Sequence, residues 1–106
     1  MHESDALPML SAMAQPTRLK VLAMLARAGG AGMASGEIAD AIGIPRHLMS
    51  SHLAVLSRAN AVVARKTGRA VVYSLNGDRL SELGRYIDSL VLPIEGADSP
   101  GANERA

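Results

Sequence analysis

The stretch that decides the fold is Ser35–Leu75, SGEIADAIGIPRHLMSSHLAVLSRANAVVARKTGRAVVYSL. It opens with a predicted helix over Ser35–Ile42, which starts at a good N-cap residue and is ended by Gly43. A second helix is predicted over Pro45–Ala59, because proline is favoured in the first turn of a helix. The short interval between the two helices is the tight turn that a helix-turn-helix motif requires.

A hairpin is predicted directly after the second helix. Apolar side chains alternate with a period of two over Val62–Lys66 and again over Arg69–Leu75, and Thr67-Gly68 supplies the turn. The segment between Ile44 and Asn76 holds five Arg or Lys residues and no Asp or Glu. A helix that begins with small polar and basic residues, followed by a basic hairpin, is typical of a winged helix-turn-helix that binds duplex DNA.

Further helices are predicted on both sides of this stretch. Two helices with apolar residues at helical spacing precede it, and a glycine-rich turn separates them from it. One helix follows the hairpin, where Asn76-Gly77-Asp78 can cap its start and Pro93 ends it. The predicted segments are helices over Ser4–Ala14, from Pro16 to Gly29-Gly30 and over Arg79–Leu92, with the turn at Gly29–Met33. The expected fold class is mainly α with a small β-hairpin: four helices, a wing and a fifth helix.

Length and composition predict a single domain. The chain has 106 residues, of which 48% are hydrophobic, and it has no cysteine. We expect the domain to span residues 1–94 and a flexible C-terminal tail to span 95–106, where the residues are small and polar. The first residues carry neither a basic region nor a long apolar run, which predicts a cytoplasmic protein without a membrane segment. The lack of cysteine excludes disulfides, thiolate metal ligands and thiol-based redox sensing.

The charge distribution favours a polyanionic partner. Residues 6–94 hold ten Lys or Arg against five Asp or Glu, a net charge of +5, although the whole chain carries only +1. Aromatic residues are limited to Tyr73 and Tyr86. Single-stranded nucleic acids are usually bound by stacking on aromatic rings, whereas a helix in the major groove needs none. The expected partner is therefore double-stranded DNA.

Three segments resemble those of the ArsR/SmtB-type winged-helix repressors, over about residues 6–92. They are QPTRL at Gln15–Leu19, SSHLAVL at Ser50–Leu56 and GRAVVYSL at Gly68–Leu75. The resemblance implies a homodimer, autoregulation of a nearby operon and release from DNA when an effector binds. The sensing sites of the family differ here: Ser35–Asp40 carries no cysteine box, and the last helix carries no histidine. The resemblance therefore extends to DNA binding but not to metal or thiol sensing.

Two groups of residues are predicted to contact DNA. In the second helix of the motif, the side chains near its start would face the major groove. The resemblance places His52 at the family's histidine, which would contact the DNA backbone or pack by a hydrogen bond. In the wing, basic side chains would contact phosphates or the minor groove. The predicted DNA-binding residues are Arg46, His47, Ser50, Ser51, His52, Arg65, Lys66 and Arg69. The alternative is an exposed helix start and a solubilising hairpin edge, and Arg18 and Lys20 could either contact phosphates or be solvated.

The first and last helices carry more apolar surface than one small core needs. A homodimer formed through these two helices would bury the excess. The residues predicted for this interface are Leu7, Leu10, Met13, Leu83, Ile87 and Leu90.

No catalytic, cofactor or metal site is predicted. The chain shows no activated nucleophile pattern and no phosphate-binding glycine loop. His47 and His52 are five residues apart and do not share a helix face, which is poor geometry for a metal pair. Met9, Met13 and Met24 could bind a soft cation, but they are explained better as residues that fill gaps in a core or interface. Asp78, Glu82 and Asp88 could bind a hard metal, but a helix cap and a solvated face explain them more simply.

The resulting prediction is a dimeric repressor that binds an inverted-repeat operator. Two alternatives stay open: a winged-helix regulator of another family that senses a small organic ligand, and a winged-helix protein-interaction module. The effector also stays open between a metal with oxygen and nitrogen ligands, an apolar metabolite and no ligand.

Overall fold

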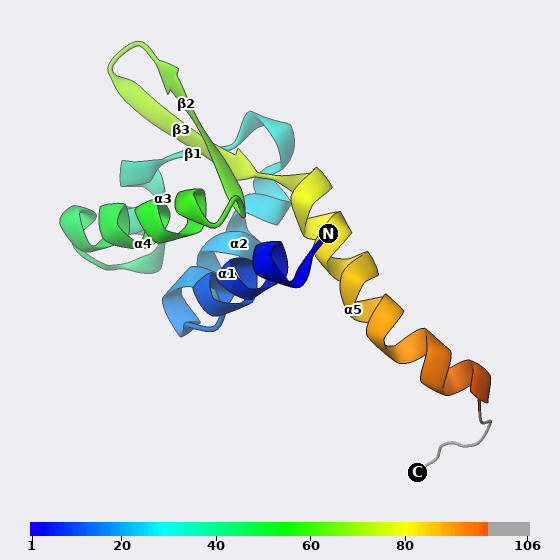
Figure 1. The fold of residues 1–106 in the computed structure, drawn as a ribbon. Coiled ribbons are helices and arrows are strands. Elements are labelled where there is room, and N and C mark those ends of the chain that lie inside the picture. Colours follow the sequence, from blue (N-terminus) through cyan, green and yellow to red (C-terminus); the bar gives the residue numbers. More distant parts are fainter. Residues whose placement is uncertain (98–106) are drawn as a thin grey trace.

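The computed structural model describes residues 1–97, with side chains described as far as Leu92. It contains five α-helices and a small antiparallel sheet within the described residues (Figure 1). This is the predicted winged helix-turn-helix. The elements are α1 (Glu3–Met13), α2 (Pro16–Ala28), the short 3₁₀ turn η1 (Gly29–Ala31), β1 (Met33–Ala34), α3 (Ser35–Ile42), α4 (Arg46–Arg58), β2 (Val62–Thr67), β3 (Ala70–Leu75) and α5 (Gly77–Ala97).

The core is built from the apolar faces of α1 to α4 and the start of the wing. Fully buried side chains such as Leu25, Ile38 and Leu53 come from three different helices. No polar or charged side chain is buried in the part of the chain that the structure describes. Met9 is completely buried, so at that position the core explanation for the methionines is the better one.

The sheet has one strand more than the sequence predicted. Its order is β1-β3-β2, and Met33 pairs with Tyr73 where a glycine-rich turn was expected. Two residues are too few to show a periodic pattern, and β1 forms because β3 offers it an edge. Gly32 makes the approach possible, since a Cβ atom at this position would collide with the carbonyl oxygen of Tyr73.

The predicted N-cap of α3 and the predicted wing turn were each wrong by one residue. Ser35 was expected to be the N-cap of α3, but Ala34 occupies that position, because its pairing in β1 keeps it extended. The Ala34 N–H donates to Glu37 Oε1 at 2.9 Å. The wing turn lies at Gly68-Arg69 rather than Thr67-Gly68, since Thr67 still pairs with Ala70. Gly68 has φ +63°, which suits the first position of a two-residue hairpin loop.

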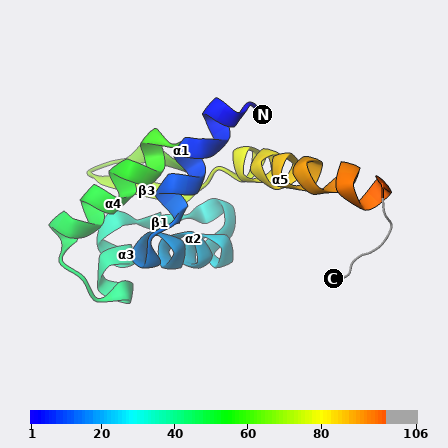
Figure 2. The same cartoon turned by 60° about the horizontal axis from the view of Figure 1, so that its bottom comes forward.

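Helix α5 starts on the body of the domain and then leaves it (Figures 1 and 2). Asn76 caps it as expected, by accepting a hydrogen bond from the Arg79 N–H at 3.4 Å. The helix continues to Ala97, so the expected end at Pro93 was wrong. A proline removes one helical hydrogen bond, but its φ is helical, and the chain can continue past it. The predicted tail begins inside α5, and residues 98–106 lie outside the described residues. No described helix is both long and apolar enough to cross a membrane.

Candidate nucleic-acid interface

Helix α4 is held by its apolar face, and the packing decides which side chains remain outside. Met49, Leu53 and Leu56 are completely buried against the core. The turn before α4 is closed by Gly43, which has φ +85° and whose N–H donates to the Ala39 carbonyl at 2.8 Å. Because α4 is fixed on this side, the opposite face of the helix points away from the protein.

The outward face of α4 carries three of the predicted residues. His47, Ser50 and Ser51 are exposed, and their spacing of three and four residues places them on one side of the helix. The Ser51 hydroxyl donates to the His47 carbonyl at 3.4 Å. The Ser50 hydroxyl has no hydrogen-bond partner among the residues that the structure describes. This small polar face can approach the edges of DNA bases closely.

Arg46, at the start of α4, forms an ion pair with a residue of α3 across the turn. Its guanidinium pairs with Asp40 at 3.1 Å, and the two side chains are 72% and 67% exposed. A Cβ atom added to Gly36 would lie 2.9 Å from Arg46 Cζ, so the guanidinium lies close against the first turn of α3. An exposed ion pair of this kind contributes about 0–1 kcal/mol, so DNA can displace Asp40. Sequence reasoning missed Asp40, because residues six apart were assigned to different helices.

His52 faces the interior rather than the outward face of α4. It is half-buried, and its Nδ1 lies 3.3 Å from Arg18 Nη1. Arginine can only donate, so Nδ1 is the acceptor in this contact. Arg18 Nε also donates to the Ala12 carbonyl at 2.6 Å. The packing role predicted for His52 thus has a partner, Arg18. Half-buried Arg18 joins α1, α2 and α4 instead of lying free in solvent.

The basic side chains of the wing differ from Arg46 in their surroundings. Arg65, Lys66 and Arg69 are all exposed, and none forms an ion pair within the described part of the chain. Arg65 pairs in register with Val72 and Lys66 with Val71, so the two side chains lie on opposite faces of the hairpin. The positive charge therefore surrounds the wing tip. The wing and α4 lie on the side of the molecule away from the far end of α5 (Figures 1 and 2).

The residues predicted for the dimer interface fall into two groups. Leu7, Leu10, Ile87 and Leu90 are between 39% and 57% exposed. Met13 is half-buried, whereas Leu83 is 3% exposed and lies within the core of the single chain, so it is not available to a partner. Two neighbours that were not predicted, Val91 and Leu92, are also exposed on α5.

Of the carboxylates near α5, Glu82 and Asp5 form an ion-pair cluster with Arg79, whereas Asp78 and Asp88 form no ion pair within the described residues. Arg79 pairs with Glu82 on the same helix at 2.7 Å and with Asp5 on α1 at 3.5 Å. This cluster ties the start of α5 to α1. Among the described residues, no three His, Asp or Glu side chains form a group that could hold a metal ion.

Comparison with known proteins agrees with this geometry. Residues 13–65 match the family described as "Helix-turn-helix domain". The HTH-type transcriptional regulator CmtR of Mycobacterium tuberculosis is 33% identical over 107 aligned residues, which cover 100% of this chain and 86% of CmtR. A crystal structure of an ArsR family transcriptional regulator, RHA00566, has a TM-score of 0.79 at 18% identity and covers 92% of this chain and 98% of its own.

A third relative is the solution structure of a fragment of Mb0332 from Mycobacterium bovis. It is described as a homodimeric winged helix-turn-helix DNA-binding domain of a possible ArsR-family regulator. It is 26% identical, with a TM-score of 0.67, and the match covers 92% of this chain and 85% of the fragment.

The family match, the relative and the winged helix-turn-helix fold place this chain among the DNA-binding transcriptional regulators. The chain belongs to the ArsR/SmtB family of helix-turn-helix transcriptional regulators.

Proposed function

We propose that this chain is an autoregulating repressor that binds an inverted-repeat operator as a homodimer. The observation that carries the proposal is the outward face of α4, where His47, Ser50 and Ser51 are exposed beside a basic wing. Two copies related by a two-fold axis would place α4 in successive major grooves about 34 Å apart. The two half-sites of the operator would then be inverted copies of each other.

The two basic regions would have different tasks. Ser50 and Arg46 would contact base edges, with Arg46 released from Asp40 when it meets a guanine or a phosphate. Arg65, Lys66 and Arg69 would neutralise phosphates around the wing tip and add affinity that does not depend on sequence. His47 would lie at the edge of the groove beside Ser51, while His52 would act from inside through its bond to Arg18.

The dimer would form through α1 and α5. Leu7, Leu10, Ile87 and Leu90 would supply its apolar contacts, since each is exposed in the single chain. Val91 would extend the same surface along α5. The homodimeric description of the Mb0332 fragment supports a homodimer, and the exposed leucines of this chain indicate the helices that would form it. The domain would span residues 1–94 and act in the cytoplasm, where operator DNA is found.

The experiment that tests the proposal is fluorescence anisotropy with labelled duplex from upstream of the protein's own gene. A scrambled duplex of equal length is the control, and both are titrated at two salt concentrations. Tight binding of one dimer to the upstream duplex, with much weaker binding to the scrambled one, is the expected result. Equal binding to both would contradict sequence-specific repression and favour a protein-interaction module.

A further inference from the structure

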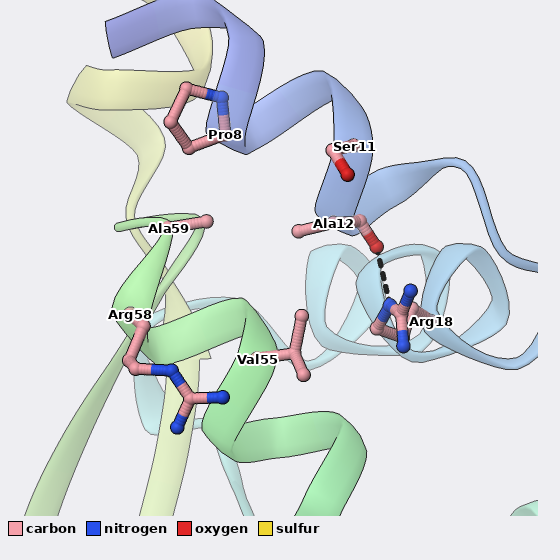
Figure 3. Close-up of a pocket in the computed structure, with 7 residues that line it drawn as sticks. All are labelled: Pro8, Ser11, Ala12, Arg18, Val55, Arg58 and Ala59. Atoms are coloured by element: carbon pink, nitrogen blue, oxygen red, sulfur yellow. Dashed lines mark hydrogen bonds between the residues drawn. The ribbon is translucent and has the colours of Figure 1, made fainter.

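A small hollow lies between α1 and the C-terminal half of α4. Its volume is about 230 Å³. Figure 3 shows Val55 directed into the space between the two helices, with Arg18 and Arg58 on either side of it. The lining residues are Pro8, Ser11 and Ala12 from α1, Arg18 from α2, and Val55, Arg58 and Ala59 from α4 or its end.

Two positive charges line the hollow, and no carboxylate of the described residues pairs with either of them. Within the described residues, neither Arg18 nor Arg58 forms an ion pair, whereas Arg46 and Arg79 both do. Among the described residues, the hydrogen-bond partners of the Arg18 side chain are the Ala12 carbonyl and Nδ1 of His52, and neither is a carboxylate. Because half-buried Arg18 forms no ion pair within the described residues, an anion placed beside it would be stabilised.

The remaining lining restricts the kind of anion. Pro8, Val55 and Ala59 provide apolar surface, and the exposed Ser11 hydroxyl adds one polar group. Ligand pockets commonly combine apolar walls with a few polar groups that fix orientation, and those for drug-sized molecules start at about 300 Å³. The hollow is therefore suited to a small organic molecule with a short apolar part and one carboxylate.

We propose that this hollow binds a small organic carboxylate, whose charged end lies between Arg18 and Arg58 and whose carbon skeleton contacts Val55. The site is connected to the DNA interface, because the Arg18 guanidinium also holds His52 on α4. A carboxylate on Arg18 competes with His52 for this guanidinium and loosens the support of α4. Only this regulatory consequence rests on the proposed function; binding of the carboxylate does not.

The test is isothermal titration calorimetry of the full chain with acetate, butyrate and benzoate, each beside its uncharged amide. Saturable binding of at least one carboxylate is expected, with its amide at least tenfold weaker. Arg58→Gln should weaken that binding at least tenfold, because it removes one charge from an exposed position. Arg27→Gln removes an exposed charge near the other end of α2 and should leave binding unchanged. No saturable binding by any carboxylate, or equal binding of acid and amide, would overturn the proposal.

Operator anisotropy with and without the bound carboxylate separates the two proposals. The carboxylate should lower operator affinity at least threefold in the wild type and have no effect in Arg58→Gln. If the carboxylate binds while the wild type shows no selective DNA binding, the repressor proposal fails and the ligand site stands. If no carboxylate binds and Arg58→Gln weakens binding to operator and scrambled duplex alike, the arginines serve a DNA phosphate and the ligand site is wrong.

Discussion

The start of α4 and the tip of the wing are both basic, but their arginines have different surroundings. Arg46 is paired with Asp40 and lies close to Gly36, so it must leave a carboxylate before it can contact DNA. The wing cations Arg65 and Arg69 have no such partner among the described residues. A cation that must leave a carboxylate needs a well-placed partner such as a base edge, whereas an exposed cation without an ion pair can contact any phosphate, and phosphates are alike in every sequence. The contrast suggests that specificity resides in α4 and general affinity in the wing.

The largest effect is expected from removing the support of α4. Leu53→Ala should lower the free energy of unfolding by about 2–5 kcal/mol, since Leu53 is completely buried. Urea denaturation followed by circular dichroism measures this change. Leu48→Ala is the matched control on the same helix, because Leu48 is 47% exposed and should cost far less. Equal losses in both variants would mean that α4 is not held by its apolar face.

The wing should control affinity without controlling selectivity. Arg65→Gln combined with Arg69→Gln should weaken binding to operator and scrambled duplex alike, by about tenfold or more at moderate salt. Each lost phosphate contact lowers the dependence of log affinity on log salt by about 0.9, so the slope should fall by about 2. Anisotropy titrations at several salt concentrations give both quantities. A loss confined to the operator would show that the wing also reads sequence.

A smaller and more selective effect is expected at Ser50. Ser50→Ala removes one exposed hydroxyl and should weaken operator binding by about fivefold, or about 1 kcal/mol, with less effect on scrambled duplex. Competition between the two duplexes measures the ratio directly. Ser57→Ala, at a half-buried position later in α4, serves as the control. If Ser50→Ala lowered both affinities equally, Ser50 would be a phosphate contact.

The smallest effect is expected from releasing Arg46. Asp40→Asn breaks an exposed ion pair and should change the free energy of unfolding by less than about 1 kcal/mol. Operator affinity should rise, by less than about threefold, because Arg46 no longer has to leave a carboxylate. Thermal unfolding and anisotropy measure the two changes. A fall in operator affinity would show that Asp40 positions Arg46 for base recognition instead of competing for it.

Sequence patterns predicted the major elements because each has a local cause. Pro45 and Gly43 mark the turn of the motif, the period of two marks the wing, and Asn76 caps α5. The exposure of Ser51 follows from the same helical periodicity that buries Leu53, because residues two apart lie on opposite sides of a helix. The errors at the β1 strand and at the α3 cap came from pairing with β3, which lies almost forty residues further along the chain.

For the candidate site too, the sequence predicted features with a local cause and missed contacts between distant segments. Helical spacing and charge indicated which side chains α4 and the wing present to solvent, since these depend only on neighbours within one element. Spacing could not show that Arg18 bonds to His52, or that Val55 and Arg58 border a hollow beside α1. These contacts join residues from helices that meet only after the chain has folded.

The amino-acid sequence by itself determined the class of fold, the order of its elements and the polar face of α4. Local preferences for helix, turn and strand are sufficient for these features, because the cause lies within a few residues. Only the tertiary structure decided that Arg18 is an internal bridge, that Leu83 belongs to the core and that Arg18 and Arg58 flank a hollow. Whether an arginine meets water, a histidine or a carboxylate depends on which distant element packs beside it, and no local pattern records that.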